Sequence, residues 1–168
     1  MKREDWEGIW QGQTVACIAS GPSLTKEDCD AVRAAGWKTI VTNTTFRLCP
    51  WADVLFGADG SWWREYSTEI AATFHGKRVT SAPSGKTFQA ETMHGQTWIS
   101  TLGNSGATAI VLAGVTGAAR IVLLGYDCQK TAGKDHWHGD HPKHLGNART
   151  MPNWPRQFKI AAKTVGIA

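Results

Sequence analysis

Apolar and polar stretches alternate along the chain in the order that is typical of strands joined by helices. Thr14–Ala19 is a continuous apolar run, which predicts a strand buried on both faces. Residues 25–35 follow, with acidic residues in the first turn and Gly36 just past the end, the signals that begin and end a helix. Lys38–Thr42 predicts the next strand. This strand–helix–strand order predicts a parallel sheet.

The same pattern continues to the end of the chain. Further strands are predicted at 53–57, 77–80, 97–100 and 120–124, and further helices at 62–74, 107–117 and 154–165. The strand at 97–100 is expected at an edge of the sheet. Together these elements predict a single α/β domain over residues 1–168, a Rossmann-like three-layer domain with a mostly parallel sheet.

A polar segment from about residue 128 to 152 interrupts this order. It carries His136, His138, His141 and His144, and it is too long for a simple connection. We therefore expect a histidine-rich lid over a binding site. The basic residues of the segment suit closing over an anionic ligand: Lys134, Lys143 and Arg149.

The composition limits the kinds of partner that we expect this protein to bind. The formal charge is +4 and the isoelectric point is about 9.0, which favours an anionic ligand. Because the basic residues are scattered along the chain, we expect a small anion rather than a nucleic acid as the partner. No apolar stretch reaches the length of a membrane span, so no membrane partner is expected. The four cysteines form no CxxC pair and no signal peptide is visible, which favours a soluble protein of the cytoplasm.

The turn after the first strand suits a phosphate. It reads Ser20, Gly21, Pro22 and Ser23, and ligands of open α/β sheets bind beyond the carboxyl ends of the strands. Backbone amides and a helix dipole attract anions there, the glycine permits close approach, and the hydroxyls add donors. The alternative is an ordinary tight turn.

Small polar and acidic residues also follow the other strands and open a later helix. They are Asn43, Thr44, Asp59, Asp127, Asn104, Ser105 and Gly106. Each alone is more often a cap or turn residue. Because the carboxyl ends of parallel strands lie at one edge of a sheet, we expect them to form one pocket for a nucleotide-derived small molecule.

Three segments carry a resemblance to known families. Residues 18–24, 41–44 and 103–127 resemble the glycosyltransferase family 42 sialyltransferases, and equally the 6-hydroxymethylpterin diphosphokinase-like proteins; small phage-encoded proteins share the pattern. The resemblance implies that the turn at 20–23 and Asn43 hold the nucleotide of an activated sugar, and that Ser105 and Gly106 face this donor. It also implies a histidine base in the lid, which points to His136, His138 or His141. Ser20 stands where the family usually has asparagine, and the lid tyrosines of the family have no counterpart.

The same histidines allow a different interpretation. Residues 135–141 spell the HxHxDH signature of metallo-β-lactamases, and His136, His138 and His141 suit a divalent metal such as zinc. That fold requires further ligands downstream, where only His144 follows. A solvated lid without metal is the alternative.

Four hypotheses follow for function. The first is a transferase that uses a nucleotide-activated donor, most simply a glycosyltransferase-like protein. The second is a non-catalytic phage protein that binds or sequesters a nucleotide-derived molecule. The third is a pterin-type diphosphokinase and the fourth a metal-dependent hydrolase; no cofactor is firmly indicated. The final sheet edge is expected to be covered by a neighbouring element or a second subunit, which allows a homo-oligomer.

Overall fold

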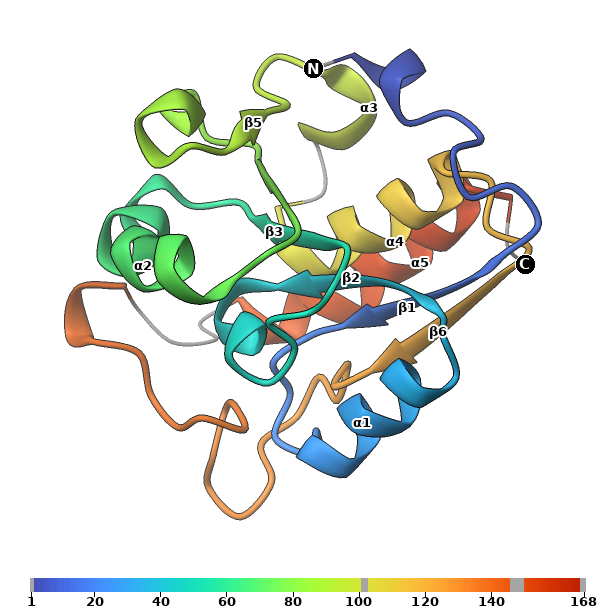
Figure 1. The fold of residues 1–168 in the computed structure, drawn as a ribbon. Helices are drawn as coiled ribbons and strands as arrows, with labels where there is room; N and C mark the ends of the chain where they lie inside the picture. Colours follow the sequence, from blue (N-terminus) through green and yellow to red (C-terminus); the bar gives the residue numbers. More distant parts are fainter. Residues whose placement is uncertain (1, 101–102, 146–149, 167–168) are drawn as a thin grey trace.

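A six-stranded sheet runs through the computed structural model, which describes residues 2–100, 103–145 and 150–166 (Figure 1). The strands are β1 (Thr14–Ile18), β2 (Lys38–Thr42), β3 (Val54–Gly57), β4 (Lys77–Thr80), β5 (Glu91–Thr92) and β6 (Arg120–Leu124). Their order is β5-β4-β3-β2-β1-β6, and every pairing is parallel. The predicted α/β class and Rossmann-like architecture are confirmed, with a sheet that is parallel throughout its described strands rather than mostly so.

Helices cover both faces of this sheet (Figure 1). They are α1 (Lys26–Ala34), α2 (Gly60–Thr73), α3 (Thr97–Ser100), α4 (Ser105–Val115) and α5 (Trp154–Thr164). Successive side chains of a strand point to opposite faces, so Ala16 and Ile18 of β1 pack in the cluster that contains α1 and α2. Val15 and Cys17 pack in the cluster that contains α4. This division gives the three layers.

The helix α4 is apolar on all sides because it is enclosed on all sides. One face contacts the sheet through Ala109 and Leu112, and Ile110 and Val111 pack against α5. Every residue from Ser105 to Ala113 is buried. A helix without a polar face is stable only in such a setting, and α4 is thereby fixed with its N-terminus near the carboxyl ends of the strands (Figure 1).

The prediction of an edge strand at 97–100 is wrong. These residues form the single helical turn α3, and the edge position belongs to β5. Ile99 is buried in the cluster that contains α4. Packing against that cluster outweighs the β-propensity of a short run such as Thr-Trp-Ile, since β-propensity depends strongly on context.

The opposite edge is β6, which pairs with β1 alone among the described strands. Leu123 of β6 is 45% exposed. The expected neighbouring element over this edge is therefore not found in the described part of the chain, and a covering second subunit stays a prediction.

The histidine-rich segment is irregular where it is described, at 128–145 and 150–152. It forms turns, the short 3-10 helix η4 (Lys143–Leu145) and the beginning of η5 (Met151–Asn153). Its role as a lid remains a prediction. No helix among the described residues combines the length and the apolar character that are needed to cross a membrane.

Candidate functional site

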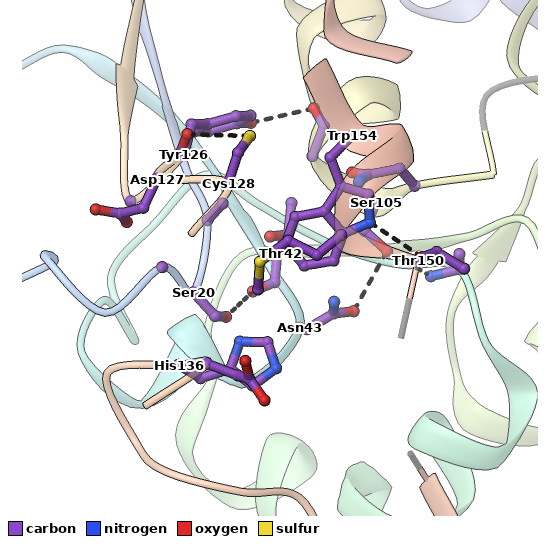
Figure 2. Close-up of a pocket in the computed structure, with 18 of the residues that line it drawn as sticks. Ser20, Thr42, Asn43, Ser105, Tyr126, Asp127, Cys128, His136, Thr150 and Trp154 are labelled. Atoms are coloured by element: carbon purple, nitrogen blue, oxygen red, sulfur yellow. Dashed lines mark hydrogen bonds between the residues drawn. The ribbon is translucent and has the colours of Figure 1, made fainter. Parts of the chain in front are cut away.

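A cavity lies where the carboxyl ends of β1, β2, β3 and β6 meet the N-terminus of α4 (Figure 2). Its volume is about 460 Å³, and small-molecule sites usually measure roughly 300–1,000 Å³. The strand order reverses at this point, since β2 to β5 extend from one side of β1 and β6 returns to the other. Ligands of open α/β sheets bind at such switch points, so the topology favours a ligand here.

The structure brings most of the predicted site residues to the wall of this cavity. These are Ser20, Gly21, Pro22, Asn43, Asp59, Asn104, Ser105, Gly106, Asp127, His136 and His141. Three others lie elsewhere. Ser23 is exposed outside the cavity, Thr44 is fully buried and accepts a hydrogen bond from Trp62 Nε1 at 3.3 Å, and His138 packs against the two lining histidines.

The turn after β1 is held tightly against the end of β6. The Gly21 amide donates to the Gly125 carbonyl at 2.9 Å. A Cβ atom on Gly21 would overlap Asp127 Oδ2 and the Gly125 carbonyl oxygen, and would lie 2.8 Å from the Gly125 carbonyl carbon. Glycine is required here because β6 approaches closely, and this approach forms one corner of the cavity.

The hydroxyl of Ser20 is engaged within the protein. It shares a hydrogen bond of 2.8 Å with Thr45 Oγ1 and lies 3.5 Å from the Thr42 carbonyl. The Ser20 carbonyl accepts from the Trp137 amide at 3.1 Å, which fastens the histidine-rich segment to the β1 turn. Ser20 therefore shapes the wall and links β1 to β2 in this structure.

The N-terminus of α4 reaches the cavity, as do the starts of α2 and α5, whereas that of α1 does not. The N-cap of α1, Thr25, is exposed and forms a capping box with Asp28, and no residue of α1 lines the cavity. In α4 the Asn104 side chain accepts from the Ala107 amide at 3.1 Å. The amides of Ser105 and Gly106 have no hydrogen-bond partner among the described residues. Unpaired amides at a helix N-terminus attract anions.

The Ser105 side chain joins three parts of the wall. Its hydroxyl accepts from the Ala58 amide at 3.3 Å and donates to Asn43 Oδ1 at 3.4 Å (Figure 2). Asn43 has a φ of 49°, a left-handed conformation that asparagine tolerates better than most residues. The ends of β2 and β3 are thus fixed to the start of α4.

Three imidazoles, those of His136, His138 and His141, form the histidine cluster. Their ring centroids are 5.1 Å, 5.2 Å and 4.7 Å apart, and Tyr66 Oη lies 3.3 Å from His141 Nδ1. Burial lowers the pKa of His136, lowers the pKa of His138 to about 3, and lowers the pKa of His141 to about 4. These rings are consequently neutral near pH 7, and His136 and His141 present neutral imidazole to the cavity.

The cluster does not have the arrangement of a metal centre. Among the described residues no group of three or more histidine, cysteine, aspartate or glutamate side chains is placed to hold a metal ion. The rings pack against one another instead, with His136 and His138 stacked at an interplanar angle of 14°. Nothing in this arrangement favours the divalent-metal interpretation of the HxHxDH pattern.

The cavity wall is acidic in its described residues. Its charged side chains are Asp59, Asp127 and Asp135, and no lysine or arginine is among them. Lys134 and Lys143 are exposed away from the wall, and Arg149 lies outside the described residues. The expected basic closure over an anion is not seen in the described residues, so the neutral donors at the start of α4 are the groups that suit a phosphate.

Sequence reasoning did not assign the last wall of the cavity. It comes from the end of the chain, where Thr150, Met151, Trp154 and Phe158 line the cavity beside Tyr126. The available signal was the pair of aromatic residues four positions apart in the final predicted helix, a spacing that puts two side chains on one helix face.

Comparisons of the chain with protein-family models, with curated proteins and with solved structures find no match.

Proposed function

We propose that this protein binds a nucleotide-activated donor, most simply a nucleotide sugar, in the cavity and transfers the activated group to an acceptor. One observation carries the proposal: the amides of Ser105 and Gly106, which have no partner among the described residues, and the neutral imidazoles of His136 and His141 belong to the same cavity. The first pair suits a phosphate and the second suits an acceptor hydroxyl.

The α4 amides would hold the phosphate of the donor. Their dipoles are already oriented, because Asn104 caps the helix and Ser105 is tied to β2 and β3. Donors fixed in this way stabilise charge that develops on a leaving phosphate without having to reorganise. Asp127 lines the cavity, and its carboxylate is suited to accept from a sugar hydroxyl of the donor.

His141 would act as the general base. Its lowered pKa keeps the ring unprotonated near pH 7. The hydrogen bond of 3.3 Å between Tyr66 Oη and His141 Nδ1 orients the ring. The acceptor oxygen would bond to the anomeric carbon of the sugar while its proton passes to the imidazole. The bond between that carbon and the phosphate oxygen would break, with its electron pair leaving on the phosphate. Such proton transfer typically contributes about 10²- to 10⁴-fold to rate.

A second candidate is a module that binds the nucleotide-derived molecule without turnover. The acidic wall favours it, because Asp59, Asp127 and Asp135 do not neutralise the charge of a departing phosphate. This hypothesis keeps the phosphate site at α4 and gives the histidine cluster a packing role only.

Affinity and turnover measured on the same variants separate the two candidates. Nucleoside monophosphates and nucleotide sugars are titrated by calorimetry, and sugar release is followed by mass spectrometry. His141→Asn should bind with nearly unchanged affinity and lose turnover by about 10²-fold or more if the histidine is the base. The matched control is His94→Asn, at an exposed histidine outside the cavity.

Binding by the wild-type protein without any turnover would favour the binding module. Failure of every nucleotide to bind at millimolar concentration would refute both candidates.

A further inference from the structure

Trp154 differs from the other aromatic residues of the cavity in what its ring contacts. Trp62 packs against Phe46, Trp63 and Tyr66, and Tyr126 packs against Phe158. The half-buried Trp154 ring makes no ring or cation contact with the described residues. It is among the side chains gathered at the cavity (Figure 2). A large apolar plane at the cavity is thus without an aromatic partner within the described chain.

The orientation of this ring is already fixed. Trp154 Nε1 donates to Thr150 Oγ1 at 3.0 Å, so the one polar atom of the indole is satisfied inside the protein (Figure 2). The residue begins α5, which packs on α4 through Phe158 and Ala161. An aromatic plane that is held in place loses little conformational entropy when a ligand packs on it.

The charges of the wall point to the kind of ligand group that would lie on this plane. No lysine or arginine among the described residues lines the cavity, so no protein cation competes for the indole face. The carboxylates also limit the affinity that phosphate groups contribute. A flat ligand ring gains its affinity from stacking instead, and a nucleobase is the flat part of a nucleotide.

We propose that Trp154 is the stacking platform for the nucleobase, with the phosphate directed to the amides of Ser105 and Gly106. This inference rests on the proposed function, and it adds a residue that determines base affinity. Stacking of a base on an aromatic side chain contributes about 5- to 150-fold in affinity. Because every base has a flat face, the platform accepts both purines and pyrimidines.

The test compares ligands with and without a base. Wild-type protein, Trp154→Phe and Trp154→Leu are titrated by calorimetry with AMP, with CMP and with ribose 5-phosphate. We expect Trp154→Leu to weaken AMP and CMP by about 5- to 150-fold and to leave ribose 5-phosphate unchanged. Trp154→Phe, which keeps a ring, should lie between the two. Trp98→Leu is the matched control, since Trp98 is half-buried, donates to Gln96 Oε1 at 3.2 Å and does not line the cavity.

The outcomes separate this inference from the proposed function. Unchanged affinity of Trp154→Leu for AMP and CMP would overturn the stacking role and leave the phosphate site standing. Equal weakening of all three ligands would overturn it too, because the residue would then support the shape of the cavity. If the wild-type protein binds none of the three at millimolar concentration, the proposed function fails and this inference with it.

Discussion

Replacing Gly21 by alanine tests the close contact on which the cavity depends. The added Cβ would overlap Asp127 Oδ2 and the Gly125 carbonyl oxygen, and it would stand 2.8 Å from the Gly125 carbonyl carbon. The Asp127 side chain can rotate away. The Gly125 carbonyl cannot, because it belongs to the backbone at the end of β6 and accepts the Gly21 amide at 2.9 Å. The turn and β6 must therefore separate.

The cost follows from this overlap. Inserting a carbon into a tightly packed site typically costs about 1–3 kcal/mol of unfolding free energy. For a chain of this size each kilocalorie lowers the melting temperature by about 2–4 °C, so the expected drop is about 2–12 °C. Separation at this corner should also weaken nucleotide binding, since Gly21, Gly125 and Asp127 all line the cavity.

Thermal unfolding followed by circular dichroism measures this effect. The matched control is Gly60→Ala at the start of α2, where the added Cβ would lie 3.2 Å from the Ser84 hydroxyl, a side-chain atom that can rotate away. Alanine favours a helix over glycine, so the control should melt at the wild-type temperature or slightly above. A Gly21→Ala protein that melts like the control, with unchanged nucleotide affinity, would refute the close contact and the corner of the cavity built on it.

Three further predictions concern the start of α4 and the histidine cluster. Asn104→Ala removes the cap on the Ala107 amide and should cost about 1 kcal/mol in urea unfolding; an unchanged midpoint would argue against the cap. Ser105→Ala breaks the links to β2 and β3, should cost about 0.5–1.5 kcal/mol, and should weaken CMP binding; equal affinity by calorimetry would contradict this. Burial lowers the pKa of His138 to about 3 and that of His141 to about 4, below the value of 6.5 expected in the unfolded chain. The unfolded state thus binds more protons in this range, and stability should be complete above pH 6.5 and fall as the pH drops toward 4. His138→Asn should flatten that slope in urea unfolding, and an identical slope would count against the buried neutral ring.

Much of the fold follows from local patterns. Residues 15–19 are all apolar, a short run that is typical of a strand covered on both faces, and β1 has that environment. Parallel order then requires the polar residues after β1, β2 and β3 to lie at one edge, which is why Ser20, Asn43 and Asp59 could be assigned to one pocket before the fold was known.

The choice between two helix starts could not be made from local sequence. Thr25 and Asn104 both carry the side chains of an N-cap, and both helices follow a glycine-containing stretch. What distinguishes them is the position of each helix in the fold. β6 pairs beside β1 and α4 is enclosed between the sheet and α5, so the α4 amides reach the cavity.

The details of the long polar segment were also beyond sequence reasoning. Turn conformations there depend on distant contacts, such as the bond from the Trp137 amide to the Ser20 carbonyl. With the segment folded in this way, His136 and His138 stack on each other and His138 stays off the cavity wall. The same dependence on tertiary packing left open which of the nine tryptophans could face a ligand until α5 could be seen against α4.

The central claim is that the N-terminus of α4 holds a phosphate in this cavity, and backbone amide chemical shifts test it most directly. In a ¹H–¹⁵N spectrum of the wild-type protein titrated with CMP, the amides of Ser105 and Gly106 should shift most, together with that of Gly21. The amides at the start of α1, beginning with Lys26, should stay unchanged. Shifts concentrated at α1, or no shifts at millimolar CMP, would contradict the account.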